Sequence, residues 1–210
     1  MRLLKCCRER SFATFAREVI DIRKLICLTI LLCLVLSGCA AEQNNRQLQQ
    51  AVEFRAAVMA AETCQFSADV TVNFSDHVYQ FTLACTYLPD GEAVLSVVEP
   101  ESIAGISARI SPDGADVEYD GVMISFGQLA NGHVAPMALP WVLGNAWTKG
   151  YISSAGKDGD STLITCLLGY EEKQLTVETW LGEGNVPVHS EIYYDGQCCI
   201  TAVLRDFNLQ

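Results

Sequence analysis

The chain has 210 residues, half of them hydrophobic, and its 25 acidic against 14 basic residues give a formal net charge of −11. The imbalance is concentrated after Cys39, where seven basic residues face 22 acidic ones, so this part carries 7 − 22 = −15. A polyanionic domain repels phosphate backbones and anionic lipid headgroups, which excludes nucleic acid as a partner.

An uncharged apolar run of twelve residues, 25–36, comes after the basic pair Arg23-Lys24. A membrane-spanning helix needs about 20 apolar residues, whereas the hydrophobic region of a signal peptide needs about 7–15. The run ends in Leu36-Ser37-Gly38-Cys39, which resembles the bacterial lipobox, whose cysteine thiol receives a diacylglyceryl group and becomes the mature N-terminus. We therefore predict that residues 1–38 are a lipoprotein signal peptide and that Cys39 is lipidated. The alternative is an ordinary signal peptide in which Cys39 is incidental.

Small and polar residues come after Cys39, which predicts a lipid-anchored tether over residues 39–45. Buried acyl chains on Cys39 would hold the protein on the extracytoplasmic face of the cell membrane. Residues 1–22 are longer than a usual signal n-region, which indicates that the true start codon lies further downstream. The remaining 46–210 is long enough for one domain with a substantial core.

Residues 46–63 contain good helix formers with no Gly or Pro, which predicts an amphipathic helix. We expect its apolar stripe to comprise Leu48, Val52, Arg55 and Met59, widened by Ala51 and Val58.

Apolar and polar residues alternate over 65–76 and again over 78–88, the clearest strand signal in the chain. The short Asp76-His77 link predicts a hairpin. Strands are predicted next over 93–98, 106–110, 115–119 and 122–126, at the spacing of an antiparallel meander.

The alternation stops over 127–150, a segment that holds Pro136, Pro140, Trp141 and Trp147. Leu139 to Trp147 is predicted as a short helix with Pro140 in its first turn, and such an apolar interruption is typical of a lid or plug. Strands are predicted again over 150–155, 161–168, 174–181, 187–194 and 197–204. The expected fold is mainly β (α+β): a curved antiparallel half-barrel of ten to eleven strands, its concave face covered by the N-terminal helix and the helical insert.

Five cysteines lie beyond Cys39, namely Cys64, Cys85, Cys166, Cys198 and Cys199. An odd number cannot pair completely within one chain, and no CxxC spacing indicates zinc. We expect most of them to be buried thiols, with a disulfide involving Cys64 or Cys198/Cys199 left open.

No metalloprotease, serine-hydrolase, P-loop or dinucleotide motif is present in the sequence. Carboxylates at Asp158/Asp160 and Glu171/Glu172 fall in turns, and the series Asp113, Asp116, Glu118 and Asp120 lacks the calcium-binding order of an EF-hand. We therefore predict no catalytic residue, no metal, no cofactor and no enzymatic activity.

Most aromatic side chains fall on the apolar faces of strands or in the insert. They form either a filled core or a core that admits an acyl chain or a partner's apolar segment. For the second alternative, the candidate cavity or lid residues are Phe81, Leu83, Trp141 and Trp147.

The lipobox, the polar tether, the helix from Arg46, the long meander and the helical insert together resemble the LolA/LolB-like lipoprotein superfamily. The similarity is strongest over Phe66 to Pro140, including the segment 97–106 and the Tyr119-Asp120-Gly121 turn, and it is greatest to clostridial germination lipoproteins of the GerS type. The resemblance implies an incomplete barrel of about eleven strands around an apolar cavity plugged by helices.

The sequence supports two functional hypotheses. The first is a membrane-anchored, non-enzymatic envelope lipoprotein that binds an acyl chain or lipoprotein lipid in its half-barrel. The second, implied by the GerS resemblance, is an interaction protein that regulates a cell-wall (spore cortex) enzyme during germination or sporulation.

Overall fold

The computed structural model describes residues 45–74, 77–112, 114–119, 122–126, 129–130, 133–134, 136–169 and 174–210. The chain divides into two compact units, Met1–Asn45 and Arg46–Gln210, of which the second contains the folded domain. The predicted signal peptide, the lipidation of Cys39 and the tether up to residue 44 lie outside the described residues and stay predictions.

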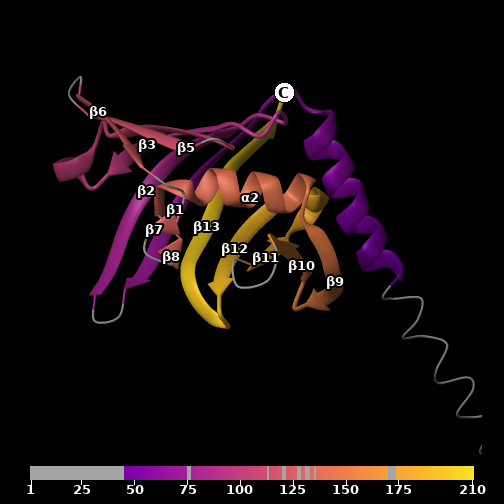
Figure 1. The fold of residues 1–210 in the computed structure, drawn as a ribbon. Coiled ribbons are helices and arrows are strands. Elements are labelled where there is room, and N and C mark those ends of the chain that lie inside the picture. Colours follow the sequence, from indigo (N-terminus) through magenta and orange to yellow (C-terminus); the bar gives the residue numbers. More distant parts are fainter. Residues whose placement is uncertain are drawn as a thin grey trace, which may run out of the picture. The chain divides into compact units, whose positions relative to one another are not determined.

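The second unit is built on one antiparallel sheet of eleven strands, strongly curved (Figure 1). In chain order these are β1 (Cys64–Phe74), β2 (His77–Tyr87), β3 (Ala93–Glu99), β4 (Ser107–Ser111), β5 (Gly114–Tyr119), β6 (Val122–Phe126), β9 (Tyr151–Asp158), β10 (Ser161–Leu168), β11 (Leu175–Leu181), β12 (Pro187–Tyr194) and β13 (Gln197–Leu209). Two further strands, β7 (Leu129–Ala130) and β8 (His133–Val134), form a small separate hairpin.

The sheet consists of two meanders joined through the first and the last strand. Its order is β6-β5-β4-β3-β2-β1-β13-β12-β11-β10-β9, so β6 and β9 are the two edges and the sheet does not close. The join is the β1–β13 pair, in which Val70 lies opposite Ala202. The predicted mainly-β open half-barrel of ten to eleven strands is confirmed.

Period-two alternation places every second side chain of a strand in the core. In β11, for example, Leu175, Val177, Thr179 and Leu181 are buried, while the residues that alternate with them are half-exposed. The predicted first hairpin is also confirmed, with Val70 of β1 opposite Phe81 of β2. We call the face that carries the buried residues the inner face and the opposite one the outer face.

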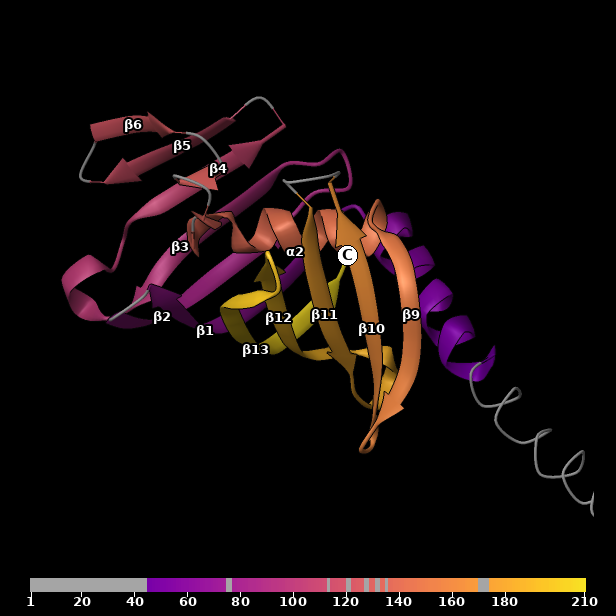
Figure 2. The same ribbon diagram turned by 60° about the horizontal axis from the view of Figure 1, so that its bottom comes forward.

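Two helices and three short 3-10 turns complete the described part of the unit. The N-terminal helix covers residues 45–60, and α2 (Leu139–Thr148) crosses the inner face, where it contacts β2, β3 and β10 (Figures 1 and 2). The turns are η1 (Glu101–Ile103), η2 (Pro136–Ala138) and η4 (Glu183–Asn185). The predicted helix over 139–147 is confirmed, with Pro140 in its first turn, where a missing N–H costs no helical hydrogen bond.

The N-terminal helix packs with a different face from the one predicted. Leu48, Val52 and Met59 are 46%, 52% and 57% exposed, whereas the residues turned to the core are Gln47, Ala51, Phe54 and Val58. Of the predicted set, only the flanking Ala51 and Val58 are buried. The reason is contact distance, since small Ala51 lets the helix approach the sheet and Phe54 reaches the ring of Trp147, 5.6 Å away between centroids.

Candidate functional site

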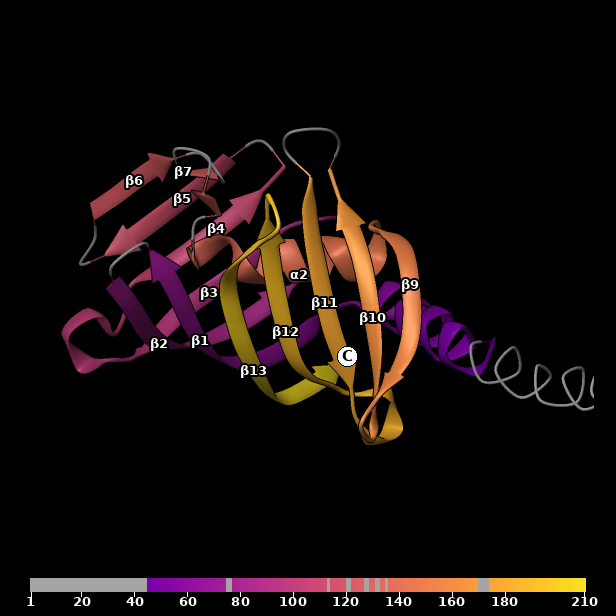
Figure 3. The ribbon, with the colours of Figure 1, turned by 90° about the horizontal axis from the view of Figure 1, so that it is seen from below.

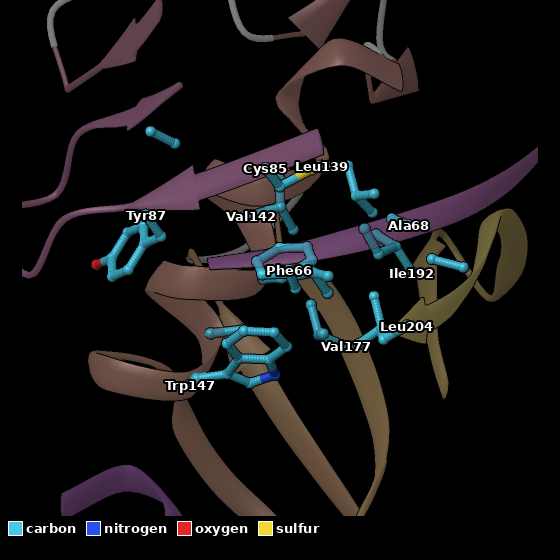
Figure 4. Packing of buried hydrophobic residues seen from close by; sticks show 14 of the residues in the cluster. Phe66, Ala68, Cys85, Tyr87, Leu139, Val142, Trp147, Val177, Ile192 and Leu204 are labelled. Carbon is cyan, nitrogen blue, oxygen red and sulfur yellow. The ribbon is translucent and has the colours of Figure 1, made fainter. Parts of the chain in front are cut away.

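The helical insert α2 is the element through which the inner face could be opened or closed. Nine of its ten residues are buried, all except Trp141, which is partly exposed. Figure 4 shows Leu139, Val142 and Trp147 of α2 among the buried side chains of the core. It lies closely against β2 because residue 144 is glycine: a Cβ there would come within 2.1 Å of the Tyr87 ring. Gly144 thus sets the distance at which α2 lies on the sheet.

The C-terminal end of α2 is bound by Arg55 of the N-terminal helix. The Arg55 guanidinium donates hydrogen bonds to the carbonyl oxygens of Trp147 at 2.8 Å, of Gly150 at 2.5 Å and of Ala146 at 3.4 Å. The last carbonyls of a helix have no partner within it and carry partial negative charge, so a cation stabilises them. Arg55 was predicted to lie in an apolar stripe; it instead caps α2.

Side-chain hydrogen bonds add to this attachment. The Tyr87 hydroxyl lies 3.0 Å from the Thr148 hydroxyl, and both side chains are buried. The Trp147 indole N–H donates to Thr179 of β11 at 3.0 Å, and Thr179 bonds in turn with Ser190 of β12. These buried polar groups therefore all have partners, as a stable core requires.

Trp147 is also the centre of an aromatic cluster at this end of α2. Its ring centroid lies 5.6 Å from those of Phe54 and Phe66 and 6.1 Å from that of Phe207. Edge-to-face geometry dominates these contacts, the arrangement that ring quadrupoles favour. The N-terminal helix, β1, β13 and α2 are joined through this one side chain.

The N-terminal end of α2 lacks comparable polar contacts. The Trp141 indole N–H is buried and has no hydrogen-bond partner among the described residues. Partly buried apolar side chains that pack against the core occur all round the sheet, and Phe81, Ile103, Ile106, Val117 and Met137 are among them. An unpaired buried donor costs about 1–3 kcal/mol, so this end is held less favourably than the other.

The four predicted cavity or lid residues divide between these two environments. Leu83 and Trp147 are 0% and 2% exposed and belong to the packed core, while Phe81 and Trp141 are partly buried at its margin. Whether any of them contacts a ligand stays a prediction. Reasoning from the sequence missed Arg55, Tyr87 and Gly144, and the one available signal was a glycine in the middle of an apolar helix.

The five described cysteines are all free thiols. Cys64, Cys85 and Cys166 are buried on the inner face, as expected for most of them, and Cys198 and Cys199 are half-buried. Burial raises the pKa of Cys64 to about 12 and also raises the pKa values of Cys85 and Cys166, the last opposed by the nearby Arg55 cation. Such thiols are protonated and unreactive at neutral pH.

The outer face carries a group of interacting titratable side chains. Glu178 of β11 lies directly opposite Glu191 of β12. Glu191 accepts a hydrogen bond from Tyr193 and, at 3.2 Å, interacts with His189. Burial and the neighbouring Glu191 raise the pKa of Glu178, whereas the hydrogen bond from Tyr193 lowers the pKa of Glu191. Within the part of the chain that the structure describes, no group of three or more His, Cys, Asp or Glu is arranged to hold a metal ion.

No protein-family model matches the chain, and no curated protein matches it. Solved structures do. A LolA superfamily protein from Nitrosomonas europaea matches with 15% identity and a TM-score of 0.42, covering 80% of this chain and 94% of that one. The Mycobacterium tuberculosis lipoprotein LppX matches with 12% identity, a TM-score of 0.35 and coverage of 78% and 93%. A structure of the CwlD amidase in complex with the GerS lipoprotein, from Clostridioides difficile, matches with 14% identity, a TM-score of 0.39 and coverage of 75% and 92%.

The predicted resemblance to LolA-like proteins agrees with what the chain is similar to among solved structures, where the GerS complex is one neighbour among several. At identities of 12–15% the likeness concerns the fold alone. Among the described residues, none of the helices is both long and apolar enough to cross a membrane.

Proposed function

We propose that this protein is a non-enzymatic envelope lipoprotein, anchored through Cys39, that binds an acyl chain or lipoprotein lipid on the inner face of its open sheet. The supporting observation is the unequal attachment of α2. Arg55, Tyr87 and Thr179 bind its C-terminal end through polar contacts, while its N-terminal end, at Trp141, is held by apolar packing and carries an unpaired donor.

That asymmetry suits a plug hinged at one end. Lifting the N-terminal end breaks no side-chain hydrogen bond to the sheet among those described, and it exposes the inner-face side chains of β2 and β3. An acyl chain would replace the apolar contacts that α2 gives up, each buried CH₂ contributing about 0.8 kcal/mol. Phe81 of β2 and Trp141 lie at the margin of the core, where we expect such a chain to enter.

The test is native mass spectrometry of residues 40–210, combined with lipid extraction of the same sample. We expect one co-purifying or added acyl species to be bound per chain. Trp141→Asp should abolish this binding, because it places a charge at the N-terminal end of α2, where we propose that the acyl chain enters. Val98→Asp, at an exposed site on the outer side of β3, is the matched control and should retain the lipid. A clean apo mass that takes up none of the offered lipids would contradict lipid binding.

A second candidate function is binding and regulation of a cell-wall enzyme, and the outer face favours it. Glu178 and Glu191 are like charges placed directly opposite each other, an arrangement that destabilises the isolated sheet. The rings of Trp180 and His189 pack against each other in a tilted arrangement beside them, with ring centroids 4.9 Å apart. A partner's Arg or Lys side chain would relieve the repulsion and gain from the aromatic rings. Binding of a purified cell-wall amidase that is lost in Glu178→Gln/Glu191→Gln, with lipid uptake unchanged, would support this candidate instead.

A further inference from the structure

The N-terminal helix presents a second apolar face, turned away from the sheet. Leu48, Val52 and Met59 are about half-exposed, and Ala56 between them is exposed too. Positions i, i+4, i+8 and i+11 fall on one side of a helix, so these side chains form a single stripe. We call these four residues the helix stripe. Isolated exposed apolar residues are common, but a continuous stripe along a helix indicates a contact surface.

The place of this helix in the chain restricts what can cover the stripe. Five residues lie between Cys39 and Asn45, where the described helix begins, so the link has six Cα-to-Cα steps. At about 3.4 Å per residue, even a fully extended link reaches only about 20 Å. The helix itself is about 24 Å long, from 16 residues at about 1.5 Å each. If Cys39 carries the lipid anchor, the first turns of the helix therefore stay close to the bilayer surface.

The charge beside the stripe is mixed. Arg46 and Glu53 are both exposed on this helix, and the Arg55 guanidinium is bound to the carbonyls of α2. On β9, the edge strand that runs beside the helix, the exposed Lys157 is followed by the exposed Asp158 (Figures 1 and 3). The side is therefore no basic patch, and the apolar stripe and the short link to Cys39 are what favour the membrane as its partner.

We propose that the helix stripe of Leu48, Val52, Ala56 and Met59 lies in the headgroup region of the membrane and fixes the orientation of the half-barrel there. This inference rests on the proposed lipidation of Cys39. An amphipathic helix of this kind binds weakly alone, but it needs little affinity when a covalent anchor already keeps it at the surface. The same helix carries Arg55, so the element seated on the membrane also binds the C-terminal end of α2.

The experiment measures cysteine labelling of the full chain in washed bacterial membranes with a membrane-impermeant maleimide. Val52→Cys is compared with Val98→Cys on β3, because the two valines are 52% and 50% exposed in the protein itself. Mass spectrometry of each peptide separates the engineered thiol from the native cysteines, and the rate in urea gives each site's intrinsic reactivity. Equal melting temperatures of the two variants establish that both are folded.

We expect membrane-bound Val52→Cys to be protected about tenfold more than Val98→Cys. Equal protection of the two sites in a membrane-bound chain would contradict the contact between the helix stripe and the membrane, without contradicting the lipid anchor on Cys39. Formation of a disulfide-linked Val52→Cys dimer would contradict that contact as well, by assigning the stripe to a second copy. Recovery of the chain only in the soluble fraction would contradict the anchor itself, and the membrane contact with it.

Discussion

The two ends of α2 lie on the same sheet, yet they are attached by different means. At the C-terminal end, Arg55, Tyr87 and Thr179 make directed hydrogen bonds to the helix, and Trp147 packs among three phenylalanine rings. At the N-terminal end, Trp141 is partly buried against the core, and its N–H has no hydrogen-bond partner among the described residues. Directed contacts fix one geometry, whereas apolar contacts can be exchanged for those of another apolar chain. In the function that we propose, the C-terminal end of α2 is the hinge and the N-terminal end is the part that opens.

The largest expected effect comes from truncating the two α2 tryptophans in parallel. Trp147→Ala removes a fully buried ring and leaves the Thr179 hydroxyl short of a donor, so we expect a loss of about 3–5 kcal/mol in the free energy of unfolding. Trp141→Ala should cost about 1–2 kcal/mol, because its ring is half-exposed and its N–H makes no bond. Urea unfolding of both variants measures the contrast. Equal losses would remove the basis for distinguishing the two ends.

Alkaline pH should destabilise the fold through the buried thiols. Their pKa values are raised in the folded protein, so above about pH 8.5 the unfolded chain releases protons that the folded one keeps, and stability falls as pH rises. Cys64, whose pKa is raised to about 12, should contribute a loss of about 2 kcal/mol between about pH 8 and pH 10, measured as the change in the free energy of unfolding in urea.

The same titration tests Arg55. Because its cation opposes the rise in the pKa of Cys166, Cys166→Ala should relieve less of the alkaline loss than Cys85→Ala, whose pKa both burial and Cys64 raise. Urea unfolding midpoints at the two ends of that pH range measure how much of the alkaline loss of stability each variant removes. If both variants remove the same amount, Arg55 does not act on Cys166.

Gly144→Ala tests how closely α2 must approach the sheet. The new Cβ would overlap the Tyr87 ring, which is fully buried and bonded to Thr148, so helix and ring must move apart. We expect a loss of about 1–3 kcal/mol and a faster exchange of the α2 amides with solvent. Gly156→Ala is the control, since no atom lies within 4 Å of a Cβ at that position. A Gly144→Ala protein as stable as wild type would show that α2 does not depend on close contact with the Tyr87 ring.

Arg55→Met has the smallest expected effect on stability. It keeps the aliphatic stem but removes the donors to three carbonyls, which should cost about 1–2 kcal/mol. The rate of amide hydrogen exchange should then rise more at the C-terminal end of α2 than at Trp141, and residue-resolved exchange measurements would show the difference. Unchanged exchange there would show that the aromatic cluster alone holds that end.

Much of the fold could be predicted from the sequence, because strand alternation is a local signal. The hairpin of β1 and β2 and the other strands of the eleven-stranded sheet were predicted, and Pro140 marked the start of α2, whereas β7 and β8 lie in the segment where no strand was predicted. The face of the N-terminal helix could not be predicted in this way. Hydrophobicity ranks Leu48, Val52 and Met59 above Ala51, but the buried face is the one that carries Phe54, which packs against the distant Trp147, with Ala51 and Val58 about one turn to either side.

The candidate site was harder to predict from the sequence, because its contacts join residues that are far apart in the chain. Arg55 and the carbonyls it binds are more than 90 positions apart, and the fit of Gly144 to Tyr87 joins an insert to a strand. Neither contact has a local pattern. Trp141 and Trp147 looked equivalent in the sequence, and only packing separates the buried anchor from the half-exposed neighbour.

Entry of an acyl chain beneath the N-terminal end of α2 can be tested by photo-crosslinking. A fatty acid with a diazirine on its chain is bound to the protein, irradiated, and located by mass spectrometry of the peptides. We expect adducts on the peptides that contain Phe81, Ile106 and Trp141, because these side chains lie at the margin of the core. Adducts confined to the peptides of Phe54, Phe66 and Phe207, or none above a surface background, would contradict entry at this end.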